Sequence, residues 1–478
     1  MGKPTVHPTG TTLYDPSRCE NGYTLFVGKG IGALLINMNG KVVHAWQGVN
    51  GMPCKMLRGG YIFGSLRTRD AKVATQDLVD VSLMNWDGKV LWSFEHNEHV
   101  NDPDGIEWAA RQHHDYQIDG NPVGYPVPSM ESDTEFETML ILTHHNVHKP
   151  KISPQLLLED RLIEIDREGN ITWEWHMLDH FNELGLSETQ KNAIFRNPTT
   201  KPAGAEGEGD IFHVNCASYV GPNHWFDEGD ERFNPRNIIM DSREGNFLFI
   251  VSHETGEIVW RVGPDFTETP ALRILGTVVG PHNTHVIPRG LPGEGNILMY
   301  DNGGWAGYGA PSQVSKQGLK VSRRDGSRVL EFNPTTLEVV WECSGEGRSG
   351  FGANNAQRIK SHYFYSPLTS NAQRLANGNT FVCEGTTGRF MEFTPQGELV
   401  WEYLYPQLGD QLVYRAYRIP YDWVPQLPQQ NEVEIARVRN EEFTMPGAEA
   451  FSLNGVGVGV EGAQGFKKEF AHCVDKIE

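Results

Sequence analysis

Six segments of the chain repeat one pattern of hydrophobic and polar positions. Each begins with an apolar run, continues through a polar turn that usually contains glycine, and ends in a second run. The fourth residue after the turn is Trp, or His44 in the first copy. Two short strand-like runs around a glycine turn are typical of a β-hairpin. The six predicted hairpins are "LLINMNGKVVHAW" (34–46), "VSLMNWDGKVLWSF" (81–94), "RLIEIDREGNITWEW" (161–175), "LFIVSHETGEIVWRV" (248–262), "RVLEFNPTTLEVVWE" (328–342) and "RFMEFTPQGELVWEY" (389–403).

The spacing of these hairpins predicts an all-β fold, a six-bladed β-propeller. The aromatic position recurs at 44, 92, 173, 260, 341 and 401, so each repeat has room for two more strands and a four-stranded blade. The first hairpin lacks an upstream strand pair, whereas "LVYRAYRIPYDW" (412–423) supplies a strand without a hairpin. Joining these N- and C-terminal strands in one blade closes the ring. We expect the repeated Trp to pack each blade against the next.

Two segments interrupt the repeats. Residues 176–209 start with a helical pattern and continue as a Gly/Pro-rich loop, and residues 303–327 form a long loop. We expect residues 1–425 to form the propeller. Residues 426–478 lack the repeat and are expected to form a tail that packs on the propeller or on the partner subunit of a homo-oligomer.

The innermost strand of each blade lines the central channel, and these strands carry the unusual chemistry of the chain. They are expected near 52–57, 111–117, 211–219, 281–288, 369–375 and 412–420. Histidines from three blades then converge on one axis: His113 or His114, His213, and His282 or His285. One member of the last pair is expected to face the channel, because residues three apart on a strand point to opposite faces. Further polar residues of the inner strands are expected beside them: Asn215, Asn371, Arg374, Tyr414 and Arg415.

A packing role is the first alternative for these histidines. A single buried histidine most often satisfies a backbone group. Three at equivalent positions favour a functional site, because Val or Ile fills a purely apolar position better. A second group in "LTHHNVHKP" (142–150) comprises His144, His145 and His148, which either reach the same channel mouth or lie in solvent.

Composition limits the classes of molecule that the protein binds and the cellular compartment in which it works. With 478 residues and a net charge of −20, the chain is large, acidic and poorly suited to bind nucleic acid or anionic membranes. No apolar run reaches the length of a membrane span, and the start has no signal-peptide core, so we expect a cytoplasmic protein, or a periplasmic one if the start has been trimmed. The six cysteines are scattered without a Cys-x-x-Cys pair, so we expect reduced thiols.

Several motifs, in order along the chain, resemble one known family. They are "GTTLYDPSRCENGYTLF" (10–26), "NGKVVHAW" (39–46), "HHDYQ" (113–117), "FHVNCASY" (212–219), "DNGG" (301–304), "NAQRLANGNTFVCEGTTGRFMEFTPQGELVWEY" (371–403) and "YRAYRIP" (414–420). The pattern is similar to the bacterial aryl-sulfate sulfotransferases and covers about residues 10–425. The resemblance implies a six-bladed propeller that moves a sulfuryl group between phenolic compounds through a channel histidine, without a nucleotide donor or another cofactor.

The resemblance also implies roles for individual residues. "FHVN" places His213 and Asn215 on the family's channel motif, "PHNTHV" supplies His282 or His285, and "YDNGG" supplies Asn302. The transiently sulfated histidine of the family comes late in the chain, where His362 and the distant His472 are the candidates. The expected catalytic residues are His114, His213, His282, His285 and His362. The expected substrate-binding residues are His113, His145, Asn215, Asn302, Asn371, Arg374, Tyr414 and Arg415.

The same histidines admit two other functions. Imidazoles from separate strands that meet on one axis also build Cu, Zn, Fe or Ni sites, and a metal-dependent enzyme acting on a small aromatic molecule is the main alternative. A propeller that only binds partners is the second. The expected metal ligands, if an ion is bound, are His113, His114, His144, His145, His213, His282 and His285.

Overall fold

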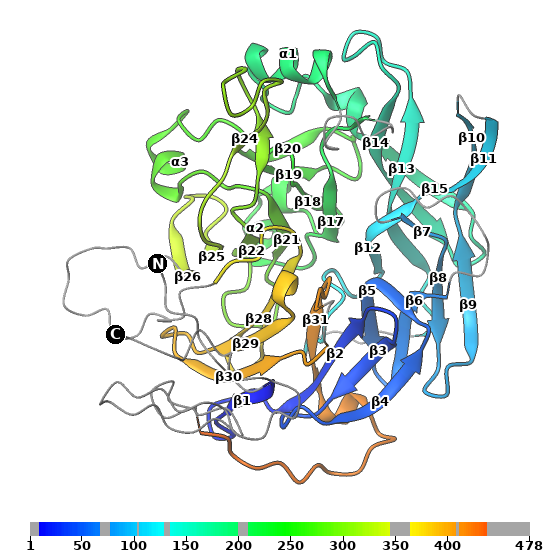
Figure 1. Cartoon of the computed structure of the whole chain (residues 1–478), viewed down its shortest axis with the longest axis vertical. Coiled ribbons are helices and arrows are strands. Elements are labelled where there is room, and N and C mark those ends of the chain that lie inside the picture. The colour runs from blue at the N-terminus through cyan, green and yellow to red at the C-terminus, as the bar shows by residue number, and fades with distance from the viewer. Residues whose placement is uncertain are drawn as a thin grey trace, which may run out of the picture.

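The computed structural model describes residues 9–66, 77–102, 105–128, 134–198, 209–344, 364–407 and 411–436. Its main sheets are antiparallel and stand around a central axis as the six blades of a propeller (Figure 1). The predicted fold is therefore confirmed. The labels of β5, β12, β17, β21 and β31 lie nearest the centre of the ring, where the sequence placed the inner strands (Figure 1).

The four strands of each blade follow one another from the innermost to the outermost position. The first comprises β31 (Ala416–Pro420), β2 (Gly22–Gly28), β3 (Gly32–Ile36) and β4 (Val42–Gln47). The second comprises β5 (Asn50–Leu57), β6 (Tyr61–Ser65), β8 (Asp80–Met84) and β9 (Val90–Glu95). The third comprises β12 (Gln112–Ile118), β13 (Thr138–Val147), β14 (Leu157–Asp166) and β15 (Ile171–His176).

The other three blades follow the same order. The fourth comprises β17 (Val214–Tyr219), β18 (Ile238–Ser242), β19 (Phe247–Val251) and β20 (Ile258–Val262). The fifth comprises β21 (Pro281–Val286), β22 (Ile297–Asp301), β25 (Arg328–Phe332) and β26 (Val339–Ser344). The sixth comprises β27 (Ser370–Arg374), β28 (Thr380–Glu384), β29 (Arg389–Phe393) and β30 (Leu399–Leu404).

The two ends of the chain close the ring twice. The C-terminal strand β31 pairs antiparallel with β2, from Gly22 opposite Pro420 to Phe26 opposite Ala416, as the sequence predicted. In addition, β1 (Gly10–Tyr14) pairs with β30 as a fifth, outermost strand of the sixth blade. Sheet edges are thereby covered where first and last blades meet. Residues of the tail continue this seam, since Tyr14 pairs with Ile435.

Indole groups of the repeat join neighbouring blades. Trp92 Nε1 donates to the Arg167 carbonyl in the outer turn of the next blade, at 2.8 Å. Trp260 and Trp401, also at the repeated position, donate to the carbonyls of Pro334 and Met38. Trp46 and Trp175, two residues beyond the repeated position, donate in the same way to Asn85 and Gly256. Buried indole N–H groups need an acceptor, and here each one ties two blades together. This supports the predicted packing role of the repeated Trp.

The insertions lie outside the four-stranded blades. Residues 176–198 contain η1 (Met177–His180) and α1 (Glu188–Arg196), whose N-terminus has a capping box between Ser187 and Gln190. The predicted long loop contains a hairpin, β23 (Ala306–Tyr308) and β24 (Leu319–Ser322), which packs against α1. The third blade gains β7 (Asp77–Leu78) and β16 (Gly209–Asp210) at its flanks. Further short elements are β10 (Asn97–Asp102), β11 (Gly105–Ala110), α2 (His224–Asp227), η2 (Glu231–Phe233), α3 (Pro270–Leu275), η4 (Gly385–Thr387) and η5 (Tyr421–Trp423).

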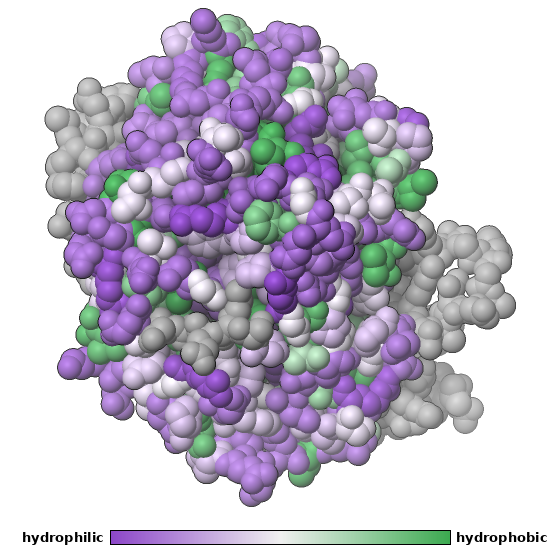
Figure 2. All heavy atoms as spheres, turned by 180° about the vertical axis from the view of Figure 1, so that it is seen from behind, coloured by the Kyte–Doolittle hydropathy of each residue, from purple (hydrophilic) through white to green (hydrophobic). Residues whose placement is uncertain are grey.

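Apolar side chains fill the blades and the spaces between them, and the visible outer surface is mostly polar. Figure 2 shows hydrophobic residues scattered singly or in small groups among hydrophilic ones. Within the described residues, none of the helices combines the length and the hydrophobicity that crossing a bilayer requires. The five described cysteines are free and buried, whereas Cys473 and the rest of residues 437–478 lie outside the described residues.

Candidate active site

Three inner strands are bent at the positions where the histidines lie. His114, His213 and Asn283 have left-handed backbones, with φ of 54°, 49° and 55°. The register shifts beside each of them, in β12, β17 and β21. A non-glycine residue in this region costs about 1–3 kcal/mol and is found most often at functional sites. A bulge of this kind turns its side chain out of the regular alternation of the strand.

Four imidazoles form one buried cluster at these bends. His113 Nδ1 lies 2.7 Å from His114 Nδ1. The His113 ring stacks on His144 with centroids 3.5 Å apart, and the His114 and His213 centroids are 4.8 Å apart. Burial and then the neighbouring imidazoles hold the pKa values of His113 and His114 well below the usual value. Both rings are therefore neutral near pH 7.

Two aspartates fix histidines of this cluster. His213 Nδ1 lies 2.6 Å from Asp210 Oδ2, and the other oxygen of Asp210 accepts the His213 backbone N–H at 3.2 Å. Burial alone raises the pKa of Asp210, but His213 outweighs it and holds that pKa below its usual value. His144 Nδ1 lies 2.6 Å from Asp77 Oδ1. Burial disfavours the charged ring, but Asp77 outweighs this and raises the pKa of His144 to about 9.

His282 is held in one tautomer by its surroundings. Its Nδ1 lies 2.8 Å from Asn302 Oδ1 and 3.2 Å from the Gly280 carbonyl. The Asn302 amide cannot turn over, because its nitrogen donates to the Ser366 carbonyl at 2.5 Å and its oxygen accepts from Ser370 Oγ at 3.2 Å. Two acceptors at Nδ1 require the proton there, so Nε2 carries the lone pair. Burial, followed by the charge of Arg243, holds the pKa of His282 well below its usual value.

His285, three residues along the same strand, is satisfied by protein groups. Its Nδ1 donates to the Asn283 carbonyl at 2.9 Å, and its Nε2 accepts from Tyr125 Oη at 3.0 Å. Burial lowers its pKa to about 4. The pair in "PHNTHV" is thereby divided: within the described residues His282 Nε2 has no hydrogen-bond partner, whereas both ring nitrogens of His285 are occupied.

Several of the predicted substrate-binding residues hold the inner strands together. Asn215 donates to the Pro281 carbonyl at 2.7 Å, and Asn371 exchanges two hydrogen bonds with the Ala416 backbone at 2.8 and 2.9 Å. Tyr414 Oη donates to the carbonyls of Asn215 and His114 at 3.0 and 3.2 Å. These contacts fix the backbone beside the strained bends.

The predicted basic residues lie in two separate ion pairs. Arg415 contacts Asp115 Oδ2 at 2.9 Å, and Lys55 contacts Asp115 Oδ1 at 2.7 Å, all deep in the channel. Arg415 also donates to the Asn215 carbonyl at 2.7 Å. Arg374 pairs with Glu331 at 2.5 Å, so its guanidinium is engaged away from the histidine cluster.

Two other candidate histidines stand apart. His145 is half-buried beside Glu98, with Nδ1 3.5 Å from the carboxylate, because neighbours on a strand point to opposite faces. His148 is exposed. His362 and His472 lie outside the described residues.

Three carboxylates and one arginine of this region were not predicted from the sequence. Asp77, Asp160 and Asp210 are 2%, 2% and 5% exposed, and each contacts an imidazole. Arg243 is buried as well. A polar "ED" that interrupts the apolar strand 156–165 was a visible signal for Asp160, and Asp210 lies only three residues before its partner His213, but nothing local marks the partners of Asp77 and Asp160.

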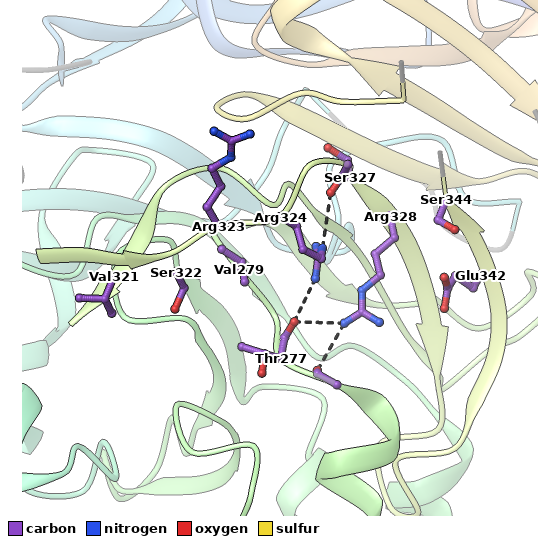
Figure 3. A pocket seen from close by; sticks show the side chains of 12 residues that line it. Thr277, Val279, Val321, Ser322, Arg323, Arg324, Ser327, Arg328, Glu342 and Ser344 are labelled. Atoms are coloured by element: carbon purple, nitrogen blue, oxygen red, sulfur yellow. Dashed lines mark hydrogen bonds between the residues drawn. The ribbon is translucent and has the colours of Figure 1, made fainter. Parts of the chain in front are cut away.

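A pocket of about 500 Å³ is lined by residues that include Thr277, Arg324, Ser327, Arg328 and Glu342. Figure 3 shows Arg324 and Arg328 from its wall both reaching the Thr277 carbonyl. The same two arginines pair with Asp301 at 2.7 and 2.8 Å. Asp301 precedes Asn302, so the pocket's positive charge is used to hold the turn that orients His282.

The chain is similar to several solved structures at low sequence identity. Solved structures with similar arrangements include a protein of unknown function from Bacteroides caccae (12% identity, TM-score 0.41, covering 84% of this chain and 99% of that chain). Virginiamycin B lyase from Staphylococcus aureus (10%, 0.33, 84% and 90%) and apo AztD from Citrobacter koseri (8%, 0.34, 84% and 98%) are similar to a lesser degree.

Comparison with protein families, unlike these structural similarities, identifies the family of the chain. No curated protein sequence matches the chain. The arylsulfotransferase (ASST) family model matches residues 131–415, more than half of the chain, and this stretch includes His144, His213 and His282. The predicted family is confirmed. The chain belongs to the arylsulfotransferase family and is an aryl-sulfate sulfotransferase-like enzyme.

Proposed function

We propose that the enzyme carries a sulfuryl group from an aryl sulfate to a phenolic acceptor on His282 Nε2, without a nucleotide. The observation that carries this proposal is the fixed tautomer of His282, whose Nδ1 is hydrogen-bonded to Asn302 and Gly280. A neutral imidazole with a free Nε2 lone pair is the nucleophile that such a transfer needs. The lowered pKa of His282 keeps it in that form at neutral pH.

The first half-reaction loads the histidine. The Nε2 lone pair attacks sulfur, the bond between sulfur and the aryl oxygen breaks, and its electron pair leaves with the oxygen. His213 supplies a proton from Nε2 to that oxygen, while its Nδ1 proton stays with Asp210 at 2.6 Å. This is the role of a general acid oriented by a carboxylate.

The second half-reaction reverses these movements. The acceptor phenol gives its proton to His213 Nε2, its oxygen attacks sulfur, and the bond between sulfur and His282 breaks. The electron pair returns to His282 Nε2, so both histidines regain their starting forms. Charge on the sulfuryl oxygens needs donors or cations nearby. Arg243, whose charge acts on His282, and His114 Nε2, which has no partner among the described residues, support this part of the proposal.

The first test is turnover by the wild-type enzyme. With 4-nitrophenyl sulfate as donor and phenol as acceptor, we expect nitrophenolate release and phenyl sulfate formation in the absence of any nucleotide, from about pH 6 to about pH 9. Colorimetry and mass spectrometry measure the two products. A nucleotide sulfate donor serves as the comparison. Absence of release from the aryl donor, or strict dependence on the nucleotide, would overturn the proposal and leave the fold and family unchanged.

A further inference from the structure

A second constellation of chemically active groups lies beside the proposed transfer pair. His113, His144 and Asp160 come from β12, β13 and β14, three neighbouring strands of the third blade. His144 and Asp160 are directly opposite each other in the register of β13 and β14. His113 stacks on His144 with ring centroids 3.5 Å apart. The three side chains therefore form one layer on a rigid sheet.

Each of the three side chains has one buried atom without a partner among the described residues: His113 Nε2, His144 Nε2 and Asp160 Oδ2. The three residues are each about 2% exposed or less, and their ligand-type atoms all lie within 4.8 Å of one another. A buried polar atom without a hydrogen bond costs about 1–3 kcal/mol. Three such atoms converging on one point are the arrangement that an ion would satisfy.

The opposite atom of each side chain is already held. His144 Nδ1 lies 2.6 Å from Asp77 Oδ1, and His113 Nδ1 lies 2.7 Å from His114 Nδ1. Asp160 Oδ1 accepts the Val214 backbone N–H at 3.1 Å. Metal-binding histidines usually have their second nitrogen fixed in this way by a carboxylate or another acceptor.

The buried charges around these three side chains also favour a bound cation. Asp77, Asp160 and Asp210 bring three buried carboxylates together. Within the described residues, the ionic partners of these carboxylates are imidazoles, and none is a lysine or an arginine. Buried carboxylates require compensating positive charge. In the metal-free form the protonated His144 ring supplies part of this charge, and a divalent cation that displaces its Nε2 proton supplies it at one point instead.

We propose that His113 Nε2, His144 Nε2 and Asp160 bind a divalent first-row transition-metal ion. Two imidazoles and one carboxylate are ligands suited to Zn²⁺ or Fe²⁺, and they leave coordination positions for water or a substrate oxygen. The three ligand atoms already lie within 4.8 Å of one another, so small movements of the side chains bring them to one ion. The site is separate from His282 and does not depend on the sulfuryl-transfer proposal.

Metal content of the full chain, expressed without a polyhistidine tag, tests this inference. We expect about one equivalent of a transition metal per chain by elemental analysis, either as purified or after reconstitution with Zn²⁺ or Co²⁺. Bound Co²⁺ is expected to show visible ligand-field bands of a site with nitrogen and oxygen ligands. Anomalous scattering from wild-type crystals soaked in Zn²⁺ is expected to place the ion between His113, His144 and Asp160.

Substitutions of the proposed ligands test which side chains bind the metal ion. Asp160→Asn and His144→Gln are expected to lose the Co²⁺ bands, and Asp77→Asn to weaken binding by about 10- to 100-fold. His145→Gln is the matched control, because His145 is the next residue of β13 and faces Glu98, and it is expected to bind Co²⁺ as the wild type does. Circular dichroism checks the fold of each variant.

Two outcomes overturn the inference without any variant having to fold. One is wild-type protein that holds no metal as purified or after reconstitution, and the other is anomalous density elsewhere in the molecule. The inference is also overturned if both Asp160→Asn and His144→Gln retain the Co²⁺ bands. Sulfuryl transfer is assayed separately, so failure of either proposal is recognised independently of the other.

Discussion

Replacing His282 with glutamine is expected to reduce sulfuryl transfer by about 10⁴-fold or more, because loss of a covalent nucleophile is among the largest effects in enzyme mutagenesis. Glutamine can still donate to Asn302 Oδ1, which His282 Nδ1 contacts at 2.8 Å, but it has no basic nitrogen for sulfur. The rate of nitrophenolate release from 4-nitrophenyl sulfate measures the loss. Wild-type activity is expected to persist at about pH 6, because the lowered pKa of His282 keeps its ring unprotonated there.

The matched control for this variant is His285→Gln. His285 lies on the same strand and is equally buried, but both of its ring nitrogens are occupied by Asn283 and Tyr125. We expect it to retain activity within about tenfold once circular dichroism shows that it is folded. Equal losses in both variants would mean that the effect is structural. An active His282→Gln enzyme would remove His282 from the role of nucleophile.

The second large effect is expected at the His213–Asp210 pair. General acid-base catalysis contributes about 10²- to 10⁴-fold, and its value rises as the leaving group becomes more basic. His213→Gln is therefore expected to slow turnover of phenyl sulfate by that factor and to slow 4-nitrophenyl sulfate much less, because nitrophenolate leaves without a proton. Asp210→Asn is expected to slow the two substrates in the same pattern as His213→Gln. An amide donor in place of the carboxylate favours the wrong tautomer of His213.

Comparison of the two donors separates catalysis from structure. A merely structural role for His213 predicts equal losses for phenyl sulfate and 4-nitrophenyl sulfate, whereas an acid predicts a larger loss for phenyl sulfate. Rates are measured for wild type, His213→Gln and Asp210→Asn on both donors. Equal losses would contradict the assigned role while leaving His282 untouched.

Most of the fold follows from the sequence because its signal is local and repeated. Six hairpins with one aromatic position gave six blades, and the unpaired strand after the sixth hairpin gave the closure by β31. The docking of β1 on β30 was not predicted. A single five-residue strand carries no repeat, and its pairing depends on contacts with residues about 390 positions away, such as Thr12 with Glu402.

The candidate site was predictable to the level of strands, but not of atoms. The inner strands did bring His113, His114 and His213 together. Alternation along a strand could not tell which nitrogens stay free, because bends at His114, His213 and Asn283 break that alternation. Asp77 and Asp160 were missed because they approach from other strands: Asp77 is 67 residues from His144 in the sequence. Asp210 lies only three residues before His213 and was missed despite this short separation.

The same limit explains why predicted substrate contacts have other partners. Asn215 and Asn371 sit on inner strands, where a polar side chain suggests a ligand contact. In the structure their amides join neighbouring inner strands, which have no continuous backbone ladder between blades. A buried backbone group must find a partner, and that requirement is invisible until the blades are placed beside one another.

Direct identification of the sulfated residue tests the central claim most sharply. Wild-type enzyme is incubated with 4-nitrophenyl sulfate without acceptor, quenched at alkaline pH, digested and mapped by mass spectrometry. We predict release of about one nitrophenolate per chain in the first turnover and one SO₃ group on the peptide that contains His282, which phenol then removes. An SO₃ group on a peptide containing His213, His114 or His362, or turnover without any sulfated peptide, would contradict transfer through His282.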